Sequence, residues 1–209
     1  MSSRILILAP HTDDGEFGCG ASIAHFTKEK KEVFYIAFSS AEKSVPEGMP
    51  EDILIKEVKQ ATKILGIRPD NLILFEYPVR EFPIYRQKIL ENLVKLEKKI
   101  KPDVIFLPSP NDTHQDHLVI AHEGFRAFKR STILGYEIPW NNLTFNTNAF
   151  VFLEERDLQR KIEALKCYES QAGKSYASEE FIRSLARTRG TQIGTKYAEV
   201  FEVIRWIIK

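Results

Sequence analysis

Residues 4–9 read Arg-Ile-Leu-Ile-Leu-Ala, a nearly continuous apolar run close to the start of the chain. A run of this kind is typical of a β-strand that is buried on both faces. The polar stretch Pro-His-Thr-Asp-Asp-Gly-Glu follows at residues 10–16, and the glycine-rich segment 15–20 leads into a helix expected over Gly20–Lys31. A buried strand, a polar turn and a helix in this order predict one unit of a parallel α/β sheet.

The same alternation of short apolar runs and helical spacing continues along the chain. Further strands are expected at Val33–Phe38, Asn71–Phe75, Asp103–Leu107, Thr132–Glu137, Asn148–Leu153 and about Ala198–Ile204. Further helices are expected at Glu51–Leu65, Ile84–Ile100, Leu118–Phe128, Glu155–Tyr168 and near Ser178–Arg187. The tight connection between the fifth and sixth strands indicates an antiparallel edge. The pattern therefore predicts a mostly parallel sheet with helices on both faces and an antiparallel edge.

Composition narrows the class of protein. The chain has 209 residues, 43% of them hydrophobic, which suits one globular domain. Thirty Lys and Arg against 29 Asp and Glu leave a charge of +1, too little basic excess for a dedicated nucleic-acid binder. No apolar run reaches the ~20 residues that cross a bilayer, and the first ten residues lack the pattern of a secretion signal. Two cysteines are ordinary for a reducing compartment, so we expect a cytoplasmic protein.

Polar side chains gather in two segments, residues 10–16 and residues 111–117, and each segment directly follows a predicted buried strand. The first and fourth strands flank the point where the commonest doubly wound sheet reverses its strand order, and ligands bind at that point. We therefore expect the two segments to face each other across one crevice. They hold three of the five histidines, four aspartates and one glutamate. A divalent cation would neutralise such a cluster.

The residue types in these segments suit a catalytic zinc site, which needs three protein ligands and leaves one position for water. His11, one aspartate of the pair Asp13–Asp14 and one histidine of the pair His114 and His117 would complete the set. The other aspartate could accept a proton from water, as a metal-assisted hydrolase requires. The same pattern also fits a non-haem iron site, so Fe²⁺ or another divalent ion remains an alternative.

A dinucleotide site is a weaker alternative. Gly18 and Gly20 follow the first strand, as in a dinucleotide-binding fingerprint, but Ile23 stands where the third glycine belongs. The acidic residues before them would also repel a pyrophosphate.

Two stretches resemble the motifs of the LmbE-like, or PIG-L, de-N-acetylase family. Residues 11–23 (HTDDGEFGCGASI) are similar to its first motif, A-H-P-D-D followed by a glycine-rich helix entry, and residues 114–117 (HQDH) match its second motif, H-x-D-H. Weaker similarity continues through Glu57, residues 161–171 and residues 189–201. The resemblance implies a Rossmann-like three-layer α/β fold, with residues 1–209 as a single deacetylase domain.

The resemblance also implies zinc-dependent hydrolysis of an N-acetyl group on a glucosamine-containing substrate. Carried over residue by residue, it implies that the zinc ligands are His11, Asp14 and His117. Family members often form trimers or hexamers, so a homo-oligomer is implied as well. The sequence itself does not choose between this reaction, an amidase acting on a thiol conjugate, and a sugar-binding protein that has kept the metal site.

Catalytic roles follow from the same resemblance. Asp13 would be the general base, His114 in its cationic form would stabilise the oxyanion, and Asp116 would orient His114. A carboxylate beside His114 would raise the pKa of the imidazole and keep it charged. Two positions depart from the family pattern: Thr12 replaces the usual proline, which should loosen the loop, and Leu54 stands where many members have an arginine.

Four further residues are candidates for contact with the sugar. Planar donors and an aromatic ring in predicted loops or helix starts at the strand ends could meet sugar hydroxyls and a ring face. These residues are Arg80, Arg86, Trp140 and Asn141. The partner predicted from the sequence is thus a small amino-sugar conjugate, with no nucleic acid and no membrane span.

Overall fold

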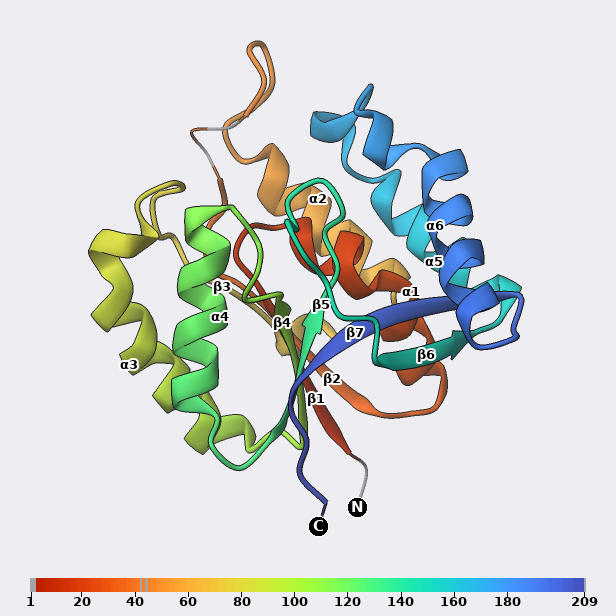
Figure 1. Cartoon of the computed structure of the whole chain (residues 1–209). Coiled ribbons are helices and arrows are strands. Elements are labelled where there is room, and N and C mark those ends of the chain that lie inside the picture. The colour runs from red at the N-terminus through yellow and green to blue at the C-terminus, as the bar shows by residue number, and fades with distance from the viewer. Residues whose placement is uncertain (1–2, 42, 44, 209) are drawn as a thin grey trace.

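A computed structural model describes residues 3–41, 43 and 45–208 of the chain. Within that part, seven strands form one sheet in the order β3-β2-β1-β4-β5-β7-β6 (Figure 1). The strands are β1 (Arg4–Ala9), β2 (Glu32–Ala37), β3 (Leu72–Leu74), β4 (Val104–Pro108), β5 (Thr132–Tyr136), β6 (Ala149–Leu153) and β7 (Tyr197–Arg205). The first five are parallel and β7 runs antiparallel to its two neighbours. The predicted mostly parallel sheet with an antiparallel edge is confirmed.

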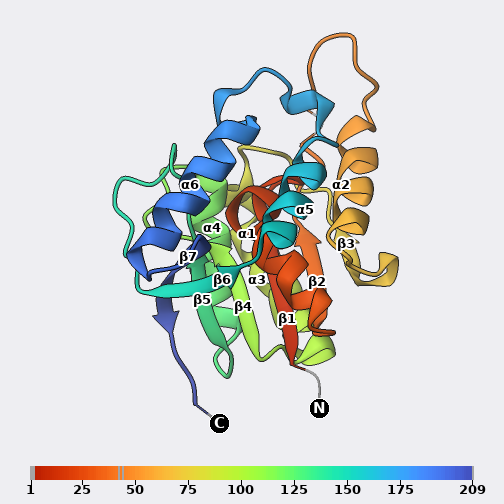
Figure 2. The same ribbon diagram turned by 90° about the vertical axis from the view of Figure 1, so that its right-hand side faces the viewer.

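Helices cover both faces of the sheet and complete three layers (Figures 1 and 2). One face carries α3 (Phe82–Ile100) and α4 (Gln115–Ala127); the other carries α1 (Asp14–Lys28), α2 (Ile53–Ile64), α5 (Glu155–Leu165) and α6 (Glu179–Gln192). Side chains of β1 alternate between the two cores: Ile5 and Ile7 pack under α1, whereas Leu6 and Leu8 pack under α3 and α4. Burial on both faces is the reason that this strand is apolar throughout.

The antiparallel edge is built differently from the prediction. β6 does not pair with β5, because β7 is inserted between the two and pairs with both. The connection from β5 to β6 therefore spans one strand position instead of forming a hairpin. The apolar pattern identified all three strands, but pairing is decided by which strands meet in the folded chain, over a separation of more than 40 residues between β6 and β7.

Three helices, α1, α3 and α4, begin earlier than predicted, and the starts of α1 and α4 bear on the polar segments. α1 begins at Asp14 and α4 at Gln115, so Asp14 and His117 lie in the first turns of helices. Helical spacing of apolar residues finds the buried turns of a helix, whereas a first turn is polar and is defined by its capping interactions. The early starts bring these side chains to the carboxyl edge of the sheet.

Close packing explains the glycines of α1. A Cβ atom on Gly15 would lie 2.5 Å from the Tyr35 ring, and one on Gly18 would lie 2.3 Å from the Tyr136 ring. The helix is also kinked at Cys19, where φ is −149°. Beyond the kink, the Glu199 carboxylate accepts hydrogen bonds from the backbone N–H groups of residues 21 and 22, at 3.2 and 2.7 Å. Glycine thus lets the first turns of α1 settle directly on the strand ends.

No helix in the described part of the chain combines the length and the apolar character that a membrane span requires.

Candidate metal centre and surrounding cleft

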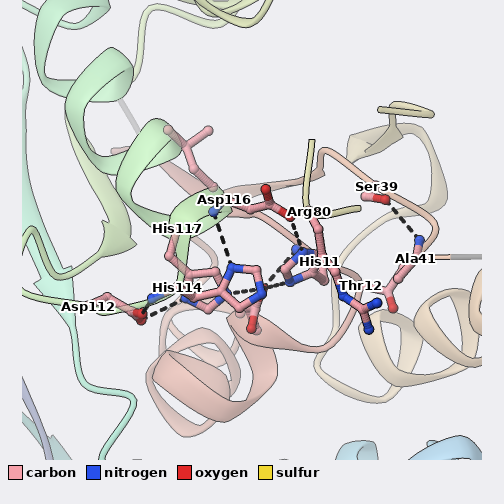
Figure 3. A network of polar contacts seen from close by, with 12 residues as sticks. His11, Thr12, Ser39, Ala41, Arg80, Asp112, His114, Asp116 and His117 are labelled. Atoms are coloured by element: carbon pink, nitrogen blue, oxygen red, sulfur yellow. Dashed lines mark hydrogen bonds and ion pairs between the residues drawn. The ribbon is translucent and has the colours of Figure 1, made fainter. Parts of the chain in front are cut away.

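The two polar segments meet at the carboxyl ends of β1 and β4. These strands are parallel neighbours in the sheet, with Ile5 opposite Val104. The segment after β1 carries His11, and the segment after β4 leads into α4. His11 Nε2 lies 3.1 Å from Asp116 Oδ2, although 105 positions separate the two residues in the sequence. The predicted crevice between the segments is therefore present (Figure 3).

Three buried donor atoms converge on one point. Asp14 Oδ2 lies 3.0 Å from His11 Nδ1 and 3.2 Å from His117 Nε2. The backbone N–H of His11 donates to the same oxygen at 2.8 Å. One ligand atom of each residue lies within 4.8 Å of the other two, which is the arrangement that a metal ion requires. We call His11, Asp14 and His117 the three-donor cluster.

A second group, His11, His114 and Asp116, also satisfies this spacing. The carboxylate of Asp116, however, already has hydrogen-bonding partners in the protein. Asp116 accepts hydrogen bonds from the backbone N–H of Arg80 at 2.6 Å and of Phe82 at 3.2 Å, in addition to the His11 contact. Asp116 therefore orients His11 through Nε2 and leaves Nδ1 directed toward Asp14. The Asp116 carboxylate thus points to the segment after β1, and the contact of Asp116 with the ring of His114, which it was predicted to orient, is made through its backbone N–H.

His114 caps α4 with its own side chain. Its Nδ1 accepts a hydrogen bond from the backbone N–H of Asp116 at 3.2 Å, which leaves the ring proton on Nε2. Burial, and then the charges of His117 and His11, lower the pKa of His114. The hydrogen bond at Nδ1 is the one that a neutral imidazole would make. A neutral ring still offers one N–H donor, at Nε2.

Asp112 is a site residue that the sequence analysis did not single out, although it lies in the second polar segment. Its Oδ2 lies 2.7 Å from His117 Nδ1, and its Oδ1 accepts the backbone N–H of His114 at 2.8 Å. It therefore fixes the orientation of the His117 ring and of the turn before α4. Its position two residues before His114 was the available signal.

We expect Asp112→Asn to weaken metal binding by about 10–100-fold, which is the usual cost of losing a carboxylate behind a metal-bound histidine. Competition with a chromogenic chelator measures the affinity. Asp70→Asn removes the charge of an exposed aspartate elsewhere and serves as the control. An unchanged affinity in Asp112→Asn would show that His117 is oriented without it.

Electrostatics favour positive charge at the three-donor cluster. Burial raises the pKa of Asp14, but the imidazoles of His117 and His11 outweigh it and hold the pKa well below its usual value. Burial lowers the pKa of both histidines, but the neighbouring carboxylates outweigh it. Asp14 and Asp116 raise the pKa of His11 to about 9, and Asp14 and Asp112 raise that of His117 to about 10. The Asp14 carboxylate therefore stays ionised and attracts a cation.

Asp13 differs from its neighbour. It is half-buried, lines the open cleft described below, and makes no side-chain cap to α1. Burial, and then the negative charge of Asp14, raise the pKa of Asp13. A carboxyl group of raised pKa facing a cleft is suited to taking up and releasing a proton. The structure thus separates the adjacent aspartates, one in the cluster and one beside it.

The segment after β1 is held from beneath by two tyrosines. The hydroxyl of Tyr35 lies 2.9 Å from the Thr12 carbonyl oxygen, and that of Tyr168 lies 2.7 Å from the same atom. Both hydroxyls also contact the buried carboxyl group of Glu16, whose pKa burial raises to about 8. Thr12 was expected to loosen this loop, but its carbonyl group is held from both sides. No local signal marks the two tyrosines, which come from distant elements.

The cluster lies at the floor of an open cleft of about 240 Å³. One wall is aromatic: Trp140 stacks on Tyr176 with ring centroids 4.1 Å apart, and Phe17 meets both rings edge-on. The lining also contains Leu54 and Arg80, together with Ala41 and Val79. Three of the four predicted sugar contacts, Arg80, Trp140 and Asn141, line this cleft.

Arg86 is placed elsewhere, which corrects the fourth prediction. Its side chain lies between α3 and α4 and pairs with the fully buried carboxylate of Glu123, which Arg126 also binds at 2.6 Å. Arg86 sits beyond the first turn of α3, so the helix directs it to the neighbouring helix and away from the strand ends. It is not among the residues that line the cleft.

Known proteins are similar to this chain in sequence and in fold. The chain is 23% identical over 220 residues to the diacetylchitobiose deacetylase of Thermococcus kodakarensis, covering 94% of this chain and 81% of the relative. It is 28% identical over 172 residues to the uncharacterized deacetylase YaiS of Escherichia coli, covering 79% and 90%. The structure of N,N'-diacetylchitobiose deacetylase from Pyrococcus horikoshii superposes with a TM-score of 0.80 at 23% identity, over 97% of this chain and 84% of that one.

The family model described as "PIG-L: GlcNAc-PI de-N-acetylase" matches residues 6–128, more than half of the chain. The match includes β1, β4 and both polar segments, and so all three residues of the three-donor cluster. Motifs, fold and family model agree: the chain belongs to the PIG-L family of de-N-acetylases.

Proposed function

We propose that this protein is a metal-dependent hydrolase that removes an N-acetyl or similar small acyl group from an amino-sugar conjugate containing N-acetylglucosamine. The observation that carries the proposal is the three-donor cluster at the floor of an open cleft, with the carboxyl group of Asp13 beside it. Membership of a de-N-acetylase family and the names of the two curated relatives support the same reaction.

The donor set fits a divalent metal ion. Two imidazole nitrogens and one carboxylate oxygen, all buried and within 4.8 Å of one another, would hold the ion through His11, Asp14 and His117. We propose Zn²⁺ as the ion, because this set matches a catalytic zinc site with one open position; Fe²⁺ is the alternative that metal analysis tests. The bound ion would supply Lewis acidity and lower the pKa of water to about 7.

The protein's own residues would move the protons. Asp13 would take a proton from the water molecule that attacks the amide carbonyl, and would pass it to the nitrogen as the C–N bond breaks. The Nε2–H group of His114 would donate a hydrogen bond to the carbonyl oxygen as negative charge develops there. One water is consumed, and the products are acetate and the amine of the sugar. Asp116 and Asp112 would act by positioning His11 and His117.

The aromatic wall suits the sugar. The faces of pyranose rings carry C–H groups that pack on aromatic rings, and polar groups near such a wall fix the orientation of a ligand. Trp140 is 41% exposed, so part of its ring is open to a ligand. Asn141 follows it, and its carbonyl group accepts hydrogen bonds from Thr113. We further propose that residues 1–209 act as one domain, that the protein is cytoplasmic, and that it forms a homo-oligomer.

Acetate release from a panel of N-acetylglucosaminides, by protein supplied with Zn²⁺ or Fe²⁺, tests the proposal. The panel also contains other N-acyl amino sugars and amides of amino-sugar thiol conjugates. Release of acetate from amino sugars is expected. Amine release from thiol conjugates alone would instead establish the rival amidase. No release from any compound, with metal bound in stoichiometric amount, would leave a sugar-binding role and overturn the proposed reaction.

A further inference from the structure

Arg80 adopts a backbone conformation that residues with a Cβ atom rarely adopt. Its φ is 69°, in the left-handed region. Two contacts to α4 hold it there: its N–H donates to Asp116 Oδ2 at 2.6 Å, and its carbonyl group accepts from the Gln115 side chain. Such conformations persist where the surrounding structure imposes them, and they cluster at ligand sites. The same carboxylate of Asp116 therefore fixes both Arg80 and His11.

The guanidinium group of Arg80 has no protein partner among the described residues. The side chain is exposed and lines the cleft on the side of His11 and Thr12 (Figure 3). Of the described residues that line this cleft, it is the one arginine, and no lysine is among them. Arg86, a few residues further along the chain, is by contrast paired with Glu123.

Three apolar residues line the cleft together with Arg80. Ala41, Leu54 and Val79 form a small apolar cluster, each no more than 6% exposed. A charge pair beside apolar side chains has fewer water neighbours than one on a fully polar surface, which strengthens it. The planar guanidinium group of an arginine can donate two parallel hydrogen bonds to two oxygens of a carboxylate or phosphate group.

We propose that Arg80 is a specificity-determining residue that binds an anionic group, a phosphate or a carboxylate, on the amino-sugar conjugate. The inference rests on the proposed deacetylase function. With the acetamido group at the three-donor cluster and the sugar ring along Trp140 and Tyr176, an anionic substituent would reach Arg80, which lines the same cleft. The preferred substrates are anionic derivatives of N-acetylglucosamine rather than neutral glycosides.

The test compares neutral and anionic substrates. Values of kcat/KM are measured for N-acetylglucosamine, its 1-phosphate and 6-phosphate, and N-acetylmuramic acid, which carries a carboxylate. Wild-type protein should prefer one anionic class by about tenfold or more, as expected for hydrogen bonds to a charged group. Arg80→Gln should remove this preference through KM, so that the anionic substrates lose more kcat/KM than the neutral one. Arg80→Lys should retain part of this preference, because the positive charge remains but the two parallel donors of the guanidinium group are lost.

Two control variants separate charge from structure. Arg130→Gln removes an exposed arginine just before β5, at the amino ends of the parallel strands and so away from the cleft, and should leave the preference unchanged. Arg80→Gly permits the left-handed backbone without strain, so it should lose the preference without lowering the midpoint of thermal unfolding. If Arg80→Gln and Arg80→Gly reduce activity on neutral and anionic substrates equally, Arg80 has a structural role and the proposal fails.

A binding measurement keeps the two proposals distinguishable. Calorimetry on the metal-free protein compares N-acetylglucosamine 6-phosphate and 1-phosphate with N-acetylglucosamine itself, in wild type and Arg80→Gln. Suppose that the phosphates bind more tightly and that this depends on Arg80, while the metal-loaded protein releases no acetate. This result would support the anionic subsite and overturn the deacetylase. Acetate release that is insensitive to the anion and to Arg80 would do the reverse.

Discussion

Replacing Asp13 by alanine is expected to lower kcat for acetate release by about 10²–10⁴-fold, the usual contribution of a positioned general base. Metal content should remain that of wild type, because Asp13 stands outside the three-donor cluster and faces the cleft. The carboxyl group caps no helix, so its removal should leave α1 in place. Rates are measured with the best substrate of the panel, and metal by atomic absorption on the same sample.

The neighbouring aspartate provides the matched control. Asp14→Asn changes a carboxylate whose Oδ2 contacts both His11 and His117, and it should therefore lose metal together with activity. Asp13→Asn keeps the shape of the side chain and should behave as Asp13→Ala does. Full turnover in Asp13→Ala, or loss of metal from it, would show that the two aspartates have been assigned to the wrong roles.

His117→Ala is expected to abolish stoichiometric metal binding and with it all measurable turnover. The side chain is only 2% exposed and contributes one of the three donors; without it, Asp14 and Asp112 lose the partner that both contact. Two ligands are one fewer than catalytic zinc sites use. Metal per chain, measured after dialysis against a weak chelator, is the primary readout, and circular dichroism reports whether the fold is retained.

His122→Ala tests whether the effect is specific to the position. His122 lies on the same helix, one turn further along, and is exposed. Its replacement should change neither metal content nor rate. If His117→Ala kept both metal and activity, the group formed by His11, His114 and Asp116 would become the candidate site, and the proposed ligand set would be wrong.

Much of the fold could be predicted because the information is local. β1 after Arg4, and β4, are apolar since each is covered on both faces, and α3 and α4 repeat buried apolar residues at helical spacing. Strand pairing at the edge is not local. β7 lies between β5 and β6 because a strand from the end of the chain pairs with both of them, and no feature of the connecting segment records this.

The candidate site divides in the same way. The motifs around His11 and His117 indicate a metal centre, since only a few residue types bind a divalent ion and the two segments follow neighbouring parallel strands. The partners of those residues depend on distances between elements. The Asp116 carboxylate contacts His11 while its backbone N–H contacts the His114 ring, and Arg86 pairs across α3 and α4 instead of facing the cleft.

The sequence by itself determined the family, the order of strands and helices, and which segments carry the polar residues of the site. These features follow from the spacing of hydrophobic residues and from short motifs. The tertiary structure alone decided the insertion of β7, the support of Thr12 by Tyr35 and Tyr168, and the position of Arg80 in the lining of the cleft. Each of these depends on contacts between residues far apart in the chain, and such contacts exist only once the layers have packed.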